Sequence, residues 1–498
     1  MSYTEANKVI SIQGPVTGNA TLYNVLSGMM LEANAKIPSA GINGVYLGDV
    51  AAEARLDRAN KSIIIDGEVI DSTKHCVAIV KGNVIPKDKQ WILDIDCDSI
   101  DVNFIDKWTN NLISNPMGRG YGHVRVEGKK RLVNVIGAVL AKDAQVTLPQ
   151  IGVTYSFTDS IYLDTTAIRF PDIQVKDQYQ NDGIFTGSVY HQYFTNIHYD
   201  LRAQADKLLV MDLPANQQSF FYGKVFGTGD VHIYGDDMDC NIDVTARTES
   251  NTKFYLNINS ASQASQSNFI HFVQPDTTRS NGILNILLPK SVEAATPLQS
   301  KLRLSLQGEV TPQAEINILL AGEDAIKGKG EGNLKLVYET PSENIQMQGS
   351  YTLHTGNFSF SLGNIVRRNF TIREGSRITW DNDPLAPTVD ITGHYHTTAS
   401  LRDLFGTESA QIATNRTSVP VNCVLHMTDQ LFDPILKFAI ELPQSDESVQ
   451  SQVNSMINTE EMLMRQIIYL LVFNRFYTPE YLQNTQNVGL NETYSLLS

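Results

Sequence analysis

The chain has 498 residues, of which 42% are hydrophobic and 19% are charged, so it can bury a large apolar surface and is not expected to be disordered. Its 39 Lys and Arg residues stand against 54 Asp and Glu residues, a net charge of −15, and the acidic residues are spread along the chain. Because nucleic-acid binding needs clustered Lys and Arg to neutralise phosphates, this composition argues against a nucleic-acid partner.

The sequence contains no obvious membrane-targeting segment. Residues 1–19 lack a basic stretch followed by an apolar one, so they predict neither a signal peptide nor an anchor. The longest nearly unbroken apolar run, residues 467–473, is far shorter than the roughly 20 residues of a membrane-spanning helix. An exported role would therefore require that an N-terminal portion is missing from this sequence.

The four cysteines form no Cys-x-x-Cys pair, which argues against a structural zinc site or a redox dithiol. Cys76 and Cys97 could be bridged if they lie on neighbouring strands, but buried free thiols are the favoured interpretation. The redox compartment stays undecided.

From about residue 9 to residue 442 the apolar residues recur with a period of two, which predicts strands interrupted by turns. Leu93, Ile95 and Cys97 alternate with three aspartates, so we expect a strand whose acidic side chains lie on its solvated face. Only two stretches in this region predict helix: residues 102–114, and more weakly residues 24–35.

The clearest strand pattern covers residues 345–353, where apolar residues alternate with polar ones. Residues 355–357 (TGN) follow it and predict a hairpin turn. Leu302 to Leu306, Ile316 to Leu320, and four further short stretches between Phe358 and Tyr395 also place their apolar side chains on one face.

Residues 444–476 lose this period and predict a helix, with Asn458 and Glu461 in capping-box spacing before its apolar part and Pro479 after it. Between Met462 and Phe473 the pattern is apolar nearly all round. Such a helix is expected to be buried in the end of the sheet, against a partner or at a membrane surface.

Strands whose apolar side chains all lie on one face need another layer that shields this face from water. A second sheet, a layer of helices or the same sheet curling over itself can provide it. Helical patterns are nearly absent, no linker divides the region and no repeat of fixed period is visible. The sequence therefore predicts an all-β fold: an elongated, curled, open β-sheet (a β-taco or groove) with a short C-terminal α-helical segment. Roughly 30 strands at about 4.8 Å each would give a length on the order of 140 Å.

No motif in the sequence points to an enzyme, a metal site or a cofactor. Asp94, Asp96 and Asp98 resemble the start of a calcium loop, but the required Gly and Glu positions hold Ser99 and Ile105. Residues 322–330 miss the spacing of a phosphate-binding loop. His394 and His396 could share one strand face, but two solvent-facing histidines are the favoured interpretation.

Four segments of the later chain are distinctive when they are taken in order. They are residues 223–229 (GKVFGTG) with 231–235 (VHIYG), residues 326–336 (IKGKGEGNLKL) continuing into 349–353 (GSYTL), residues 375–385 (GSRITWDNDPL), and residues 433–446 leading to 457–460 (INTE) and 470–473 (LLVF). In this order they resemble the C-terminal domain of the TamB family (translocation and assembly module, inner-membrane subunit). The third segment, residues 375–385, resembles the family's most recognisable motif, with Asn382 where Gly is common.

The resemblance implies a groove in the periplasm of a Gram-negative bacterium that carries phospholipid toward the outer membrane and supports the assembly of outer-membrane proteins. It also implies a TamA- or BamA-like outer-membrane β-barrel partner, and an inner-membrane anchor in the full-length protein. On this basis we divide the chain into an N-terminal part of the groove (1–215), the TamB-type C-terminal groove (216–442), an apolar helical segment (443–477) and a tail, expected to be truncated (478–498).

The strand pattern and the resemblance together nominate three groups of residues, with no catalytic or metal-binding residue among them. Residues expected to contact acyl chains in the groove are Ile345, Met347, Tyr351, Leu353, Phe358, Phe360, Leu362, Phe370, Ile372, Ile378, Trp380, Val389 and Ile391. The family-motif residues, for which a structural turn is favoured, are Trp380, Asp381, Asp383 and Pro384. The helix residues expected either to plug the sheet or to dock a partner are Ile467, Ile468, Leu470, Leu471 and Phe473.

Two other functions fit a β-rich chain. An extracellular scaffold or adhesin would have a closed sheet and a sealed apolar core. A β-helical carbohydrate-active enzyme would have a polar cleft with facing carboxylates and exposed aromatic residues. For any single groove residue, ordinary core packing is about as good an interpretation as lipid contact.

Overall fold

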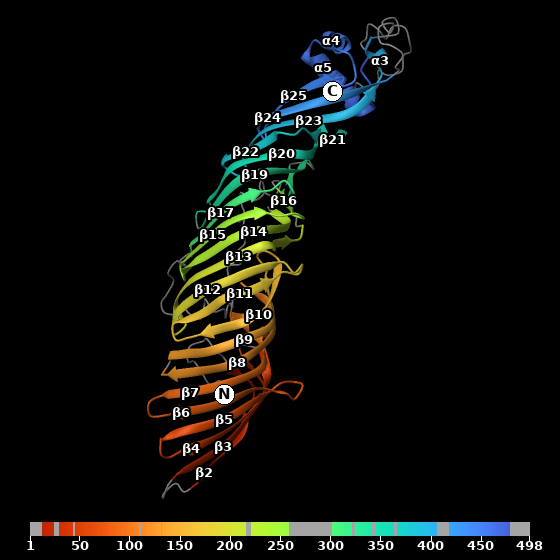
Figure 1. Cartoon of the computed structure of the whole chain (residues 1–498). Coiled ribbons are helices and arrows are strands. Elements are labelled where there is room, and N and C mark those ends of the chain that lie inside the picture. The colour runs from red at the N-terminus through yellow and green to blue at the C-terminus, as the bar shows by residue number, and fades with distance from the viewer. Residues whose placement is uncertain are drawn as a thin grey trace, which may run out of the picture.

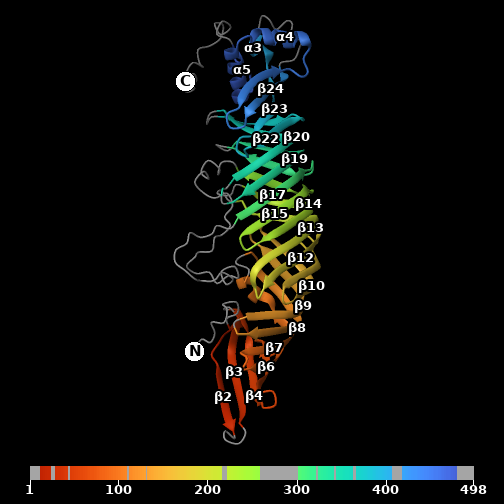
Figure 2. The same ribbon diagram turned by 90° about the vertical axis from the view of Figure 1, so that its left-hand side faces the viewer.

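The structure is a computed structural model that describes residues 12–23, 29–42, 45–108, 112–130, 132–215, 221–257, 301–320, 324–340, 342, 344–362, 366–405 and 418–478. Within these residues 25 strands form one long curled sheet (Figures 1 and 2). The first strands in chain order are β1 (Ile12–Gln13), β2 (Thr17–Tyr23), β3 (Met30–Ile42), β4 (Val45–Asp57), β5 (Ser62–Ile70), β6 (Cys76–Ile85), β7 (Gln90–Asp101), β8 (Ser114–Lys129), β9 (Leu132–Leu148), β10 (Val153–Leu163), β11 (Ala167–Lys176) and β12 (Asp182–Gln192).

The described strands continue as one sheet to its last strand, and β13 pairs directly with β14. The remaining strands are β13 (Thr195–Leu213), β14 (Phe221–Asp236), β15 (Asp239–Thr248), β16 (Lys253–Asn257), β17 (Lys301–Val310), β18 (Glu315–Leu319), β19 (Ala325–Glu339), β20 (Asn344–Leu362), β21 (Val366–Ile372), β22 (Ser376–Asn382), β23 (Thr388–Ala399), β24 (Val419–Gln430) and β25 (Ile435–Glu441). Among the described strands the pairing is antiparallel, except that β15 pairs with β17 and β16 with β18 in parallel.

Helices are confined to a few short segments. The 3₁₀ helix η1 (Val102–Trp108) follows β7, and the α-helices α3 (Leu401–Phe405), α4 (Glu447–Met456) and α5 (Glu460–Phe473) gather at the C-terminal end of the sheet (Figure 1). Among the helices that the structure describes, none is long and apolar enough to cross a bilayer. The predicted all-β fold with a C-terminal helical segment is confirmed.

Several local predictions are corrected by the structure. Residues 30–35 lie in strand β3 and not in a helix, because the sheet pairing of the long hairpin β3–β4 outweighs a weak helical pattern. The predicted helix at 102–114 is the shorter 3₁₀ helix η1. The N-cap of α5 is Thr459 and not Asn458, since the Thr459 hydroxyl accepts a hydrogen bond from the Met462 N–H.

The predicted hairpin at 355–357 is wrong, because β20 runs straight through these residues. Gly356 faces Gly328 on β19, and a Cβ added to Gly356 would lie 2.5 Å from the carbonyl oxygen of Lys327. Glycine therefore serves here for the close approach of two backbones and not for a turn. The four cysteines are free thiols, so Cys76 and Cys97 are not bridged.

Candidate functional site

One face of the sheet carries an unbroken row of apolar residues and glycines from β2 to β17. We call this side of the sheet, with the row and the rows beside it, the apolar face. Each member is the direct cross-strand partner of the next, so all of them project from the same side. The row comprises Gly18, Ala35, Ala52, Gly67, Val80, Ile95, Val124, Gly137, Leu163, Ile168, Val189, Tyr199, Gly235, Cys240 and Leu302.

A parallel row strengthens the same face. It runs through Phe170, Gly187, Leu201, Ile233, Ile242 and Leu304, and contains no charged residue. Most side chains of both rows are half-buried: they lean on one another along the curl but retain contact with solvent. In a sheet with a complete second layer, such positions would be fully covered.

The opposite face is charged and carries ion pairs between neighbouring strands. Arg125 Nε donates to Asp94 Oδ1 over 2.7 Å, and the Nδ1 of His123 lies 2.7 Å from Asp96 Oδ1. The hydrogen bond from Arg125 holds the pKa of Asp94 below its ordinary value. The prediction that these aspartates lie on the solvated face of β7 is confirmed, and the sheet is amphipathic along its length.

The apolar side of the sheet is sealed at its C-terminal end. A single cluster of buried residues, which we call the closed end, reaches from Val310 to Phe476 and includes residues of α3, α4 and α5. Phe370 at its centre is 0% exposed and lies between the rings of Phe360 and Tyr395, with centroids 6.1 and 6.0 Å away. This part of the molecule has the packing of an ordinary protein core.

The predicted groove residues lie in this closed end. Nine of them are at most 5% exposed: Tyr351, Leu353, Phe358, Phe370, Ile372, Ile378, Trp380, Val389 and Ile391. Met347 and Phe360 are partly buried against them, Ile345 is half-buried, and the side chain of Leu362 lies outside the described residues. Lipid contact by these residues stays a prediction, and the structure gives them the role of core packing.

Helix α5 covers the apolar side of the last strands. Ile467 and Leu470 are 0% and Leu471 is 1% exposed, all within the closed-end cluster, whereas Ile468 is half-buried and Phe473 is 44% exposed. The helix therefore occupies the position of a plug. Docking of a partner by this helix stays a prediction, for which Phe473 offers the accessible surface.

The end of α5 is fastened to two strands. Arg368 Nε on β21 donates to the Leu471 carbonyl oxygen over 2.7 Å, while the hydroxyls of Tyr395 and Thr397 on β23 donate to Asn474 Oδ1 over 3.2 and 3.0 Å. The side-chain amide of the fully buried Gln466 pairs with both the N–H and the carbonyl of Tyr477 over 2.8 Å. These bonds fix where the helix ends.

Of the family-motif residues, Trp380 and Asp381 lie in β22, and Asp383 and Pro384 lie in the turn that follows it. Asp383 Oδ1 accepts a hydrogen bond from the Leu385 N–H over 2.8 Å, and Pro384 is buried. Asn382 has a φ of 86°, a conformation that glycine adopts without strain. Asp381 is exposed.

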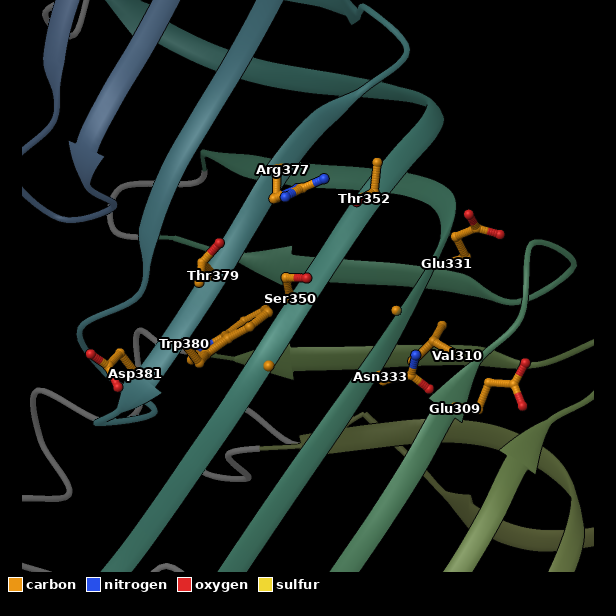
Figure 3. Close-up of a pocket in the computed structure, with 12 residues that line it drawn as sticks. Glu309, Val310, Glu331, Asn333, Ser350, Thr352, Arg377, Thr379, Trp380 and Asp381 are labelled. Atoms are coloured by element: carbon orange, nitrogen blue, oxygen red, sulfur yellow. The ribbon is translucent and has the colours of Figure 1, made fainter.

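A hollow of about 690 Å³ lies on the charged side, across β17, β19, β20 and β22 (Figure 3). Figure 3 shows Arg377 beside Thr352, with Glu331 on the next strand. Its lining mixes both signs of charge with hydroxyls. We assign no chemistry to it.

Of the two histidines on β23, His396 is held by a side chain of the neighbouring strand β24. His396 Nδ1 lies 2.7 Å from Asn422 Oδ1, and burial lowers the pKa of His394. Within the part of the chain that the structure describes, no group of three or more His, Cys, Asp or Glu side chains is placed to hold a metal ion.

The half-buried apolar rows of β4 to β15 were not among the candidate residues named from the sequence. The signal was present, since Ile63, Ile65, Val80 and Ile95 belong to the same period-two pattern as the later strands. The alternation is clearest in the later strands, which are also rich in aromatic residues, and aromatic residues are the ones that fill cores.

Comparison with known protein families gives a match. The model of the TamB C-terminal domain matches residues 171–495, about two thirds of the chain. The search of curated proteins gives no match. The matched range contains the closed end, α5 and the later part of the apolar face.

Proposed function

This chain belongs to the TamB family, and from that premise we propose that it is a lipid conduit of the periplasm whose apolar face carries the acyl chains of phospholipids between the inner and outer membranes. The family places the chain in the outer-membrane assembly system of Gram-negative envelopes. The observation that carries the proposal is the apolar row from Gly18 to Leu302, which is continuous across the strands and only partly buried.

Physical chemistry supports acyl chains as the occupant. Removing a methylene group from water contributes about 0.8 kcal/mol, so a chain that lies along successive rungs gains from each one. Because the row contains no charged side chain, an acyl chain that moves from one strand to the next meets no charged group that would have to lose its water. The head groups would remain in water at the open long side of the sheet. No catalytic group is needed for this transfer.

Lipid analysis tests the proposal directly. Protein purified without detergent is expected to retain phospholipid that mass spectrometry detects. Replacing Val80 and Val124 by Glu places two carboxylates in the row and should abolish this retention. The matched control changes Ile79 on β6 and Ile136 on β9, the strand next to β8, to Glu. Both residues lie on the charged face, so this variant should retain lipid. Absence of lipid from repeated preparations of the folded protein would sink the proposal.

A TamA- or BamA-like outer-membrane β-barrel is the proposed partner, and the last strand supports this. Among the described strands, β25 pairs with β24 and has its other edge unpaired, and Ile435 is 51% and Leu436 is 37% exposed on it. Near its end, the amide of Gln450 donates to the Ile440 carbonyl and accepts from the Leu442 N–H, so within the described residues the open part of this edge is its first half. Exposed strand edges pair readily with strands of other proteins.

Photo-crosslinking tests the partner. A photoreactive residue at Leu436 is expected to form an adduct with such a barrel, while one at Ile79, exposed on the distant strand β6, should not. Equal adducts at both positions would contradict docking at this edge.

The two alternative functions, an extracellular scaffold and a carbohydrate-active enzyme, require different features of this molecule. A scaffold needs a sealed core, which the closed end has but the half-buried rows upstream lack. Glycan cleavage that depends on a single carboxylate would establish the enzyme.

A further inference from the structure

The apolar face changes character within β17. Leu304 and Leu306 are half-buried, but Val310 on the same strand is 8% exposed and Ile326 on β19 is 1% exposed. From there to the end of α5 the side chains on this side belong to the closed end. An acyl chain that lies on the apolar face would meet packed side chains at this level and not a continuing surface.

In the closed end, α5 not only packs on the strands but is also held to them by hydrogen bonds. Arg368 on β21 and Tyr395 and Thr397 on β23 all bond to the last turn of α5 or to its C-cap, Asn474. Swinging α5 aside would break these bonds and expose Ile467 and its neighbours at the same time. Such a helix acts as a fixed part of the core.

The sheet upstream has an open long side. In the described residues each pairing joins strands that are neighbours along the stack, and no ladder joins the two ends of the curled strands into a barrel. Some of the described strand ends are hairpin turns, such as the one that joins β14 to β15. A ligand on the apolar face can therefore leave past these turns.

We propose that the closed end is a fixed stop, and that acyl chains leave the apolar face sideways at the level of β14 to β17 without passing along the last strands. This inference rests on the proposed function and adds to it where lipid leaves. The terminal third of the molecule is then a structural cap that holds the exit in place, while the conduit proper lies upstream.

The tryptophans of the chain supply native probes on either side of this stop. Trp91 on β7 is half-buried on the apolar side, against Gly128, where an added Cβ would collide with its ring. Trp380 on β22 is 5% exposed within the closed end. The sequence contains one more tryptophan, Trp108, which both probe variants remove.

The experiment exposes two variants to vesicles of phospholipid brominated on its acyl chains, because bromine quenches tryptophan fluorescence only on close approach. The first variant carries Trp108→Phe and Trp380→Phe and retains Trp91. The second carries Trp91→Phe and Trp108→Phe and retains Trp380. We expect the emission of Trp91 to be quenched, and that of Trp380 to equal its emission with unbrominated vesicles.

The outcomes separate the stop from the conduit. Quenching of both tryptophans would overturn the stop and leave the conduit standing. Quenching of neither would overturn the conduit and the stop with it. If the Trp91→Phe variant does not fold, photoreactive phenylalanine at Phe185 and at Phe438 gives the same test. A lipid adduct at Phe185 alone supports the stop, and equal adducts at both overturn it.

Discussion

The open part of the sheet and the closed end are built from the same strand pattern, yet they bury it to different degrees. Val124 on β8 and Ile391 on β23 both alternate with polar neighbours, but Val124 is half-buried and Ile391 is 1% exposed. The difference lies in the cover, because α3, α4 and α5 pack only on the last strands. One-sided alternation thus defines an apolar face, while packing from elsewhere decides whether it is core or surface.

The two parts should also differ in stability. Upstream, the other cluster of buried residues that the structure describes contains Val153, Leu209 and Phe226. The closed end contains a far larger cluster. Since local stability follows buried apolar contacts, we expect the open part to unfold at lower denaturant concentration than the closed end.

The largest loss of stability is expected when a fully buried side chain of the closed end is shortened. Phe370→Ala should destabilise that part by about 3–5 kcal/mol, because Phe370 is fully buried between aromatic rings. Val124→Ala should cost only about 1 kcal/mol in the open part, where the side chain is half-buried. Urea unfolding followed by Trp380 and by Trp91 separately checks both values. Equal losses would contradict the contrast between the two parts.

A smaller loss of stability is expected when the hydrogen bonds between α5 and Tyr477 are removed. Gln466→Leu leaves the N–H and the carbonyl of Tyr477 without their partner and should cost roughly 2–3 kcal/mol. Faster hydrogen exchange of the α5 amides measures this effect. Gln452→Leu, on the exposed side of α4, is the control and should change little.

Asp177 offers a third test, in the open part. Burial alone would raise its pKa, but hydrogen bonds from Asn181, Leu209 and Tyr179 outweigh burial and hold the pKa below its ordinary value of 3.8. Asp177→Asn should cost roughly 1–2 kcal/mol at pH 7, because the amide keeps only one of the two oxygens that accept these hydrogen bonds and replaces the other by a donor.

The pH dependence of this effect has a definite sign. A lowered folded-state pKa means that the stabilisation is present above about pH 4 and is lost as the pH falls below it. Urea midpoints of the native protein and the variant should therefore approach each other as the pH falls further below 4. Asp230→Asn, at an exposed position of β14, should leave the midpoint unchanged at both pH values. A gap that persists at low pH would contradict the assignment.

The smallest effect is expected on the charged face. Arg125→Ala removes a hydrogen-bonded ion pair to Asp94 that lies in solvent, and such pairs add little to stability. The urea midpoint read by Trp91 should not shift measurably at 0.15 M salt and should shift slightly at low salt, where screening is weaker. A large shift at either salt concentration would show that the ion-pair row stiffens the sheet.

The sequence by itself determined the class of fold and the direction in which its side chains point. A period of two allows only strands, and the near absence of helical patterns excluded a helical layer over most of the sheet. The turn at Asp383 and the plug-like helix were also legible, because both depend on residues close together in the chain. The family segments supplied the relation to TamB, which the match over residues 171–495 confirms.

Only the tertiary structure decided which apolar residues are covered. Phe370 and Val124 follow the same local rule, and what separates them is packing by helices that begin as late as Glu447 and Glu460. Gly356 shows the same limit on a smaller scale, since a turn and a close backbone approach both require a residue without a side chain. Burial is set by contacts between distant segments, and no local pattern records them.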